Sequence, residues 1–315
     1  MYLREVLKRA AFMTLGSRLR VGPRAKRIQR SHGRLVLNLH RISEPDGSTY
    51  TPMRPRIFED LLIYLKKNFS IQTFCDGRHG PAVILSFDDG YKDFLETAVP
   101  IMAKHAIRCN QNIIPECVET GRPPLNVLLQ DFVGKAPRDL VRRLDVPGFT
   151  MGGPNLGSRL SSYIKMKPMA QQRALAEYLV PQMFFWDAFR PTAMMRRADI
   201  LQIAGIHEIG AHSFSHASME TETIDYLRDD VLRCRAYFDS LGLEMNIYAF
   251  PNGSANAEHV KTVRSMGVSH VLLVGNTFDI RDDQHFRFTF HAKCRSEMRF
   301  KALGGLRPPI LNGSS

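Results

Sequence analysis

Short apolar runs alternate with amphipathic stretches along most of the chain. The runs have the length and composition of buried strands, and the stretches between them repeat apolar residues every three or four positions, as helices do. The predicted strands cover residues 35–40, 82–87, 109–114, 207–211, 245–250, 269–274 and 286–291. Strands that alternate with helices form parallel sheets covered by those helices. The pattern therefore predicts a parallel, barrel-like α/β domain of seven strands.

Two adjacent carboxylates end the second predicted strand. The run from Ala82 to Phe87 is apolar apart from Ser86, and Asp88 and Asp89 follow it directly. Two acids at the end of a buried strand repel each other and resist desolvation, so a bound cation would stabilise them. The alternative is that they cap a helix that begins near Tyr91.

Two histidines provide further metal ligands. His212 and His216 are four residues apart, a spacing that lets both imidazoles reach one ion. Taken alone, they are equally compatible with unrelated surface histidines. One aspartate with two histidines is the usual content of a divalent site that keeps a position open for water.

These motifs resemble those of the polysaccharide deacetylase family, the NodB-like carbohydrate esterases of family 4. Ser86 to Gly90 resembles the family's T/S-F-D-D-G motif, and His212 to His216 its H-S/T-x-x-H motif. Tyr248 to Gly253 resembles F-A-Y-P-Y-G, with Asn252 in place of the usual aromatic residue. The resemblance runs from about residue 35 to residue 290 and implies an irregular (β/α)7 barrel with its site at the carboxyl ends of the strands.

The resemblance also implies the cofactor. Asp89, His212 and His216 would hold a divalent metal ion. Zn²⁺ is the expected ion, although the same ligand set accepts Co²⁺, Ni²⁺ or Mn²⁺.

Roles in catalysis follow from the same resemblance. Asp88 is implied as the general base, Arg287 as its charge partner, and the backbone N–H of Asn252 as a donor to the oxyanion. We expect Tyr91 and Pro251, which follow the matched strands, to contact substrate.

The proton donor to the leaving group is less defined, because the family's late L-x-x-H motif is absent. His291 is the candidate, since it shares a face of the last predicted strand with Arg287. His40 and His285 are the alternatives, and His40, at the end of the first strand, is also expected to contact substrate.

The predicted reaction is hydrolysis of an N-acetyl or O-acetyl group on a sugar, within an acetylated glycan or a lipid-linked sugar. Two alternatives stay open. The same kind of site hydrolyses non-carbohydrate C–N amides, or the chain is an inactive glycan-binding protein. The unusually polar segment Asn110 to Asn112 and the exchange at Asn252 favour inactivity.

The domain organisation follows the elements. Residues 1–34 are expected to form a basic, partly helical arm, residues 35–300 the barrel, and residues 301–315 a tail. A helical insertion at about 120–197 is expected to fold over the barrel mouth, with helices at 125–144 and 171–180 around a glycine cluster. Its Trp186 belongs either to an ordinary core cluster or to a sugar-stacking platform.

The positive charge belongs mainly to the arm. Ten of the 43 basic residues but only one of the 31 acidic residues precede Leu35. Such an arm could lie peripherally on an anionic membrane, or pack on the body as a solvated segment. Nucleic-acid binding is not expected, because few aromatic residues interleave the charges.

Cysteine content and the apolar runs of the sequence indicate where the protein is located. Five scattered cysteines without a C-x-x-C pair, and the lack of a signal peptide or an apolar run of membrane-spanning length, predict a cytoplasmic protein, peripheral at the inner membrane surface if the arm binds lipid. The sequence does not indicate an oligomeric state.

Overall fold

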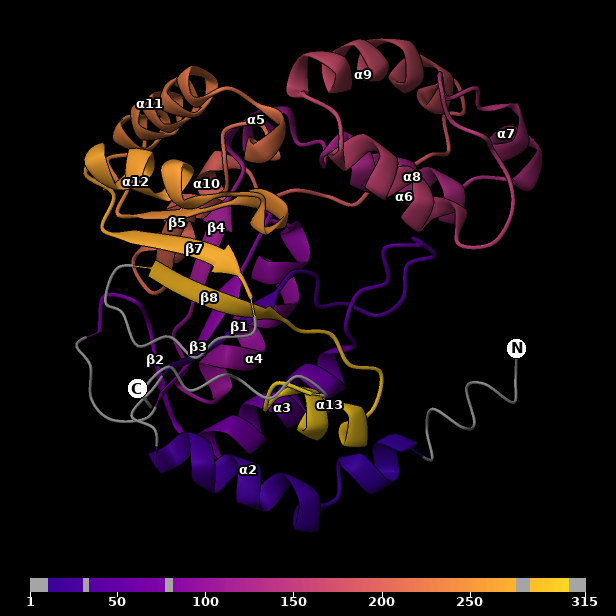
Figure 1. The fold of residues 1–315 in the computed structure, drawn as a ribbon. Coiled ribbons are helices and arrows are strands. Elements are labelled where there is room, and N and C mark those ends of the chain that lie inside the picture. The colour runs from indigo at the N-terminus through magenta and orange to yellow at the C-terminus, as the bar shows by residue number, and fades with distance from the viewer. Residues whose placement is uncertain (1–10, 31–33, 77–81, 276–283, 306–315) are drawn as a thin grey trace.

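Seven parallel strands close into a barrel in the computed structural model, which describes residues 11–30, 34–76, 82–275 and 284–305 (Figure 1). Their spatial order is β1, β8, β7, β6, β5, β4 and β3, and β3 pairs back with β1. The strands are β1 Arg34–Leu39, β3 Ala82–Phe87, β4 Asn110–Ile113, β5 Glu208–Ala211, β6 Ile247–Ala249, β7 His270–Val274 and β8 Gln284–Thr289. The predicted (β/α)7 barrel is confirmed, and each predicted strand is present.

Two details of the strands differ from the prediction. An additional short strand, β2 Ser70–Gln72, pairs with the first half of β3, and three residues are too few to show a periodicity. The last strand ends at Thr289, where its ladder with β1 reaches Asn38. His291 therefore follows β8 and does not share a strand face with Arg287, contrary to the sequence prediction.

The barrel interior has an apolar layer and a polar layer. Val36, Ile84, Ile247 and Leu272 form one buried cluster with Phe74 and Ala249. On β1 and β3 the next inward positions, two residues further on, are the polar residues Asn38 and Ser86, because side chains alternate between the two faces of a strand. Buried Asn110 and Asn112 of β4 and Arg287 of β8 are hydrogen-bonded to Ser86 and complete the polar layer. The interior is thus polar directly below the carboxyl ends of the strands.

Helices surround the barrel and bury its outer face. The larger core cluster joins outward residues of β1 and β3 to apolar residues of the flanking helices, among them Phe58 and Leu61. The helical elements around the barrel are α3 Pro55–Asn68, η1 Phe94–Ala98, α4 Val99–Lys104, α5 Pro115–Thr120, α10 Arg197–Ala204, η2 Met219–Thr221, α11 Ile224–Ser240, η3 Pro251–Gly253, α12 Ala257–Ser265 and α13 Arg295–Lys301.

The described part of the basic arm packs on the barrel. Its helix α2, Arg18–Arg30, lies along α3 and α13 in Figure 1. Val21, Ala25 and Ile28 are buried in the larger core cluster, and Gln29 Nε2 donates to the Asn68 carbonyl at 2.6 Å. Within the described residues, no helix is long and apolar enough to cross a bilayer.

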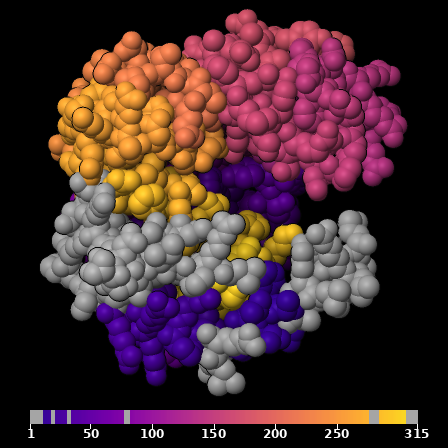
Figure 2. Space-filling model, viewed as in Figure 1, coloured from indigo at the N-terminus to yellow at the C-terminus, as the bar shows by residue number. Residues whose placement is uncertain are grey.

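The insertion forms a lobe with a hydrophobic core of its own. It consists of α6 Leu125–Lys135, α7 Arg138–Arg143, α8 Leu156–Lys165 and α9 Met169–Phe184, visible as the magenta lobe in Figures 1 and 2. The predicted helix at 125–144 is interrupted after Lys135, and α8 was not predicted, because glycines precede it. Trp186 packs against the core of this lobe. Thr49, in the loop after β1, joins lobe and barrel through bonds from its N and Oγ1 to the Gln130 carbonyl, at 3.3 and 2.9 Å.

The close packing of the barrel interior gives a stability prediction. A Cβ at Gly210 would lie 2.3 Å from Asn112 Oδ1 and 2.9 Å from Ile247 Cβ. We expect Gly210→Ala to lower the free energy of unfolding by about 1–3 kcal/mol, measured by urea denaturation. Gly205→Ala is the matched control, because no atom lies within 4 Å of its added Cβ, and it should change stability by less than about 0.5 kcal/mol. Equal effects of the two substitutions would contradict this account.

Candidate active site

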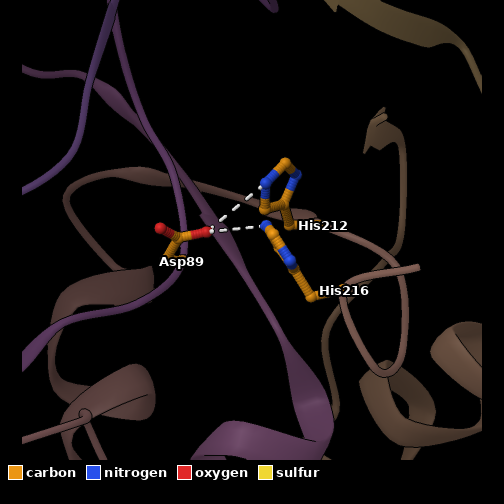
Figure 3. A group of neighbouring side chains, drawn as sticks. All are labelled: Asp89, His212 and His216. Atoms are coloured by element: carbon orange, nitrogen blue, oxygen red, sulfur yellow. Dashed lines mark ion pairs between the residues drawn. The ribbon is translucent and has the colours of Figure 1, made fainter. Parts of the chain in front are cut away.

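Three predicted ligands converge at the carboxyl ends of the strands. Asp89 Oδ1 lies 3.4 Å from His212 Nε2 and 3.5 Å from His216 Nε2 (Figure 3). One ligand atom from each residue lies within 4.8 Å of the other two, and all three residues are buried. Asp89 Oδ1 is buried without a hydrogen-bond donor in the described part of the chain. A buried carboxylate oxygen that faces two imidazole nitrogens and lacks a donor fits a divalent cation.

The protonation of these side chains suits metal binding. His212 Nδ1 lies 2.8 Å from the Ala249 carbonyl, so this nitrogen is the donor to that carbonyl and Nε2 faces Asp89. Burial lowers the pKa of His216 to about 3, which keeps its imidazole neutral near pH 7. Burial opposes ionisation of Asp89, but its electrostatic interactions with His216, His40 and His212 lower its pKa. Neutral imidazoles and an ionised carboxylate are the forms that ligate a metal ion.

Backbone conformation aims these ligands. Asp89 and His216 have positive φ angles of 77° and 64°, in the region that favours glycine. Between the two histidines, Ser213 also has a positive φ, and its hydroxyl donates to Asp230 Oδ1 at 2.8 Å. The same carboxylate oxygen accepts from the Phe214 N–H, and Oδ2 accepts from the Tyr248 hydroxyl at 2.7 Å. Buried Asp230 therefore holds the loop that carries both histidines.

Asp88 lies beside the ligand set as an ionised carboxylate. Its Oδ1 accepts from Arg287 Nη1 at 2.6 Å and from Asn112 Nδ2 at 2.8 Å. Burial would raise the pKa of Asp88, but the charge of Arg287 outweighs it and the pKa falls well below its usual range. Its other oxygen, Oδ2, lies 3.8 Å from His212 Nε2. One oxygen is thus fixed to the barrel, and the other is directed to the metal ligands.

Arg287 lies beneath the site in the polar layer. It is 0% exposed, and its Nη1 also donates to Ser86 Oγ at 3.0 Å. Asn112 contacts the same hydroxyl at 3.2 Å, and Ser86 in turn donates to Asn110. The polar segment 110–112 therefore orients Asp88 from inside the barrel, which removes its unusual composition as an argument for inactivity.

The site opens into a cavity of about 740 Å³ between barrel and insertion. Its barrel wall includes Asp88, Asp89, His40, His212, His216, Asn252 and His291. Its other wall includes Asn126, Gln130, Ser158, Ser161 and Lys165 of the insertion, which thus lies over the mouth as expected. Tyr91 and Pro251, predicted to contact substrate, are buried and do not line this cavity. Trp186 is likewise absent from its walls.

The three histidines considered as proton donors lie in different places. His291 lines the cavity, bonds to the Pro52 backbone, and has a buried Nε2 without a partner in the described chain. His40 also lines the cavity, and burial lowers its pKa despite the charges of Asp89 and Asp88. His285 lies in β8, with Nε2 3.0 Å from His270 Nδ1, and does not line the cavity.

Two residues of the site were not identified from the sequence. Asn112 could have been found from the sequence, because polar residues at alternate positions of a buried strand require polar partners. Asp230 could have been found in the same way, since it is an acid on the buried, otherwise apolar face of α11, between Leu227 and Val231.

The ligand set predicts a metal-binding stoichiometry. We expect the protein to hold about one divalent ion per chain, measured by plasma mass spectrometry, and the variants His212→Ala and His216→Ala to lose it. His105→Ala is the control, because this histidine lies beside Glu59, away from the cavity. A wild-type protein that holds neither zinc nor cobalt after reconstitution would contradict the assignment.

Comparison with known proteins supports the same family. A family model described as polysaccharide deacetylase matches residues 170–271. This stretch contains His212, His216 and Asn252, whereas Asp88 and Asp89 precede it. A search of curated proteins finds no match.

Several solved structures share the fold. The Streptococcus pyogenes deacetylase PplD, in complex with acetate, superposes with a TM-score of 0.55 and 13% identity over 86% of this chain and 97% of its own. IcaB from Ammonifex degensii superposes with a TM-score of 0.53 and 16% identity, over 86% of this chain and 97% of its own. The de-N-acetylase from Aggregatibacter actinomycetemcomitans superposes with a TM-score of 0.53 and 15% identity, over 82% of this chain and 95% of its own. At these identities the similarity concerns the fold. The family match confirms the resemblance to the polysaccharide deacetylase family for residues 170–271.

Proposed function

We propose that the protein is a metal-dependent hydrolase that removes acetyl groups from a sugar within a glycan. One observation carries the proposal: an ionised Asp88 stands beside a three-ligand set at the wall of a single open cavity. The family match and the shared barrel support a deacetylase. We further propose that the acetyl group is removed from nitrogen rather than from oxygen.

Asp88 acts as the general base in this proposal. A divalent ion held by Asp89, His212 and His216 would polarise water and the acyl carbonyl. Asp88 takes the proton of the attacking water on Oδ2, because Oδ1 is bonded to Arg287 and Asn112. Arg287 keeps Asp88 ionised and fixes its orientation.

Asn252 and His291 complete the chemistry. Asn252 lines the cavity with φ of 59° in a tight turn, and its backbone N–H is assigned to the developing oxyanion. His291 is assigned to protonate the leaving atom, because its Nε2 has no partner among the described residues and its ring bonds to the Pro52 backbone. Burial lowers the pKa of His291, so its protonated form is the stronger acid.

The proposal predicts a loss of turnover without loss of the metal. Asp88→Asn should lower kcat for acetate release from N-acetylglucosamine oligomers by about 10²- to 10⁴-fold, while mass spectrometry still finds the ion. Asp139→Asn, at an exposed position of α7, should retain activity. Full activity of Asp88→Asn would sink the proposal. Hydrolysis only of formamides or cyclic ureides would favour the non-carbohydrate amidase, and glycan binding without hydrolysis the inactive binding protein.

We also propose that α2 contacts an anionic membrane surface, which would locate the protein peripherally on the inner membrane face. Lys26, Arg27 and Arg30 are exposed on α2, opposite its buried apolar residues. We expect the triple substitution to Glu to weaken binding to vesicles with phosphatidylserine at low salt by roughly tenfold or more. Charge reversal is preferable to deletion of the arm, because Val21, Ala25 and Ile28 belong to the core. Unchanged partitioning would exclude this contact.

A further inference from the structure

The insertion brings one lysine to the active-site cavity. Lys165 is the last residue of α8, and Ser158, Ser161 and Lys165 line the cavity at the spacing of one helix face. The opposite face of α8 buries Leu160 and Ile164 in the core of the lobe. This anchoring directs the polar face of α8 toward the metal ligands.

The start of α8 also packs against the loop that follows β1. A Cβ at Gly157 would lie 2.0 Å from Thr49 Oγ1, so helix and loop are in direct contact. Asn126 Nδ2 of α6 approaches Ser161 Oγ at 3.4 Å. Lys165 therefore projects from a wall that packing holds in place.

The charge of Lys165 is not neutralised by an ion pair. No carboxylate of the described chain lies within ion-pair distance of its ammonium, and Asp89 is the acid whose charge favours its protonated form. Arg41, another cation of the cavity, is paired with Asp46 at 3.0 Å and Asp93 at 3.1 Å. Because Asp89 is assigned to the metal ion, a bound ion would offset the one acidic charge among the described residues that favours the protonated form of Lys165.

A second lysine reinforces this imbalance. Lys293, in the segment between β8 and α13, lines the same cavity from the barrel side and is exposed. Glu297, the acid nearest to it in sequence, accepts from the Lys293 backbone N–H at 2.8 Å and pairs with the ammonium of Lys301 at 2.6 Å. Burial lowers the pKa of Lys165, and the charge of Asp89 opposes that shift without cancelling it. The neutral groups of the insertion wall, Ser158, Ser161, Asn126 and Gln130, suit hydroxyl-rich ligands.

We propose that Lys165 forms a subsite for an anionic substituent of the substrate, so that the preferred substrate is an acidic acetylated glycan. The substituent would be a carboxylate or a phosphate close to the acetylated sugar, since either anion pairs with an ammonium. Lys293 adds to the attraction at the rim. This inference rests on the proposed function for its account of the substrate, but binding can be tested without turnover.

The test measures binding in the Asp88→Asn background by calorimetry, with the metal ion present. The probes are a neutral N-acetylglucosamine oligomer and oligomers of equal length that carry a hexuronate or a phosphate. We expect the acidic oligomers to bind more tightly, and Lys165→Gln to reduce their advantage by about 10- to 100-fold, whereas Lys165→Arg retains most of it. The two acidic probes identify which anion is preferred.

The matched control is Lys167→Gln, two residues further on. Lys167 Nζ lies 4.3 Å from the Tyr163 ring centroid and does not line the cavity, so its loss should leave the preference unchanged. Equal binding of neutral and acidic probes, or equal loss of both in Lys165→Gln, would overturn the subsite and leave the deacetylase proposal intact. Acidic binding through Lys165 without acetate release by the wild-type protein would uphold the subsite and refute the deacetylase.

Discussion

Arg287 places a full positive charge inside a barrel that solvent does not reach, and the polar layer is arranged around that charge. An isolated buried cation is unstable, so its guanidinium requires an anion and further acceptors at short range. Asp88 supplies the anion, and Ser86 and the Leu273 carbonyl accept further bonds. The same pairing keeps Asp88 ionised at the point where a base is needed. The contact between Arg287 and Asp88 thus both neutralises the buried guanidinium and keeps the carboxylate ionised.

The metal ligands depend on a second set of buried bonds. Asp230 accepts from Ser213, Phe214 and Tyr248, and these bonds hold a loop with left-handed residues at Ser213 and His216. The Ala249 carbonyl then fixes the imidazole of His212 from the neighbouring strand. Burial raises the pKa of Asp230 even against these bonds, so the carboxylate is held where ionisation is costly. Such costs are typical of functional sites, where stability is exchanged for orientation.

The sequence alone predicted the barrel and the identity of the residues that meet at its mouth, because apolar runs and two short motifs carry that information locally. It did not predict what depends on long-range packing. The polar strand around Asn112 has no counterpart within its own segment, since its partners Ser86 and Asp88 lie more than twenty residues earlier. The helix α8 follows a glycine cluster and becomes visible only with its packing against α6 and Thr49. The end of β8, and with it the place of His291, was set by register with β1. Tyr91 and Pro251 were expected at the substrate from their proximity in sequence to the motifs, whereas both residues are buried and absent from the cavity wall.

The insertion has a hydrophobic core of its own, and the cavity lies between the insertion and the barrel. The wall that contains the reactive groups therefore belongs to the barrel, and the wall that faces them belongs to the insertion. Residues on the polar face of α8 can change without disturbing the packing that fixes Asp88 and Arg287. Because the two walls are separate, the insertion could change to select a different substrate while the catalytic residues of the barrel stay the same.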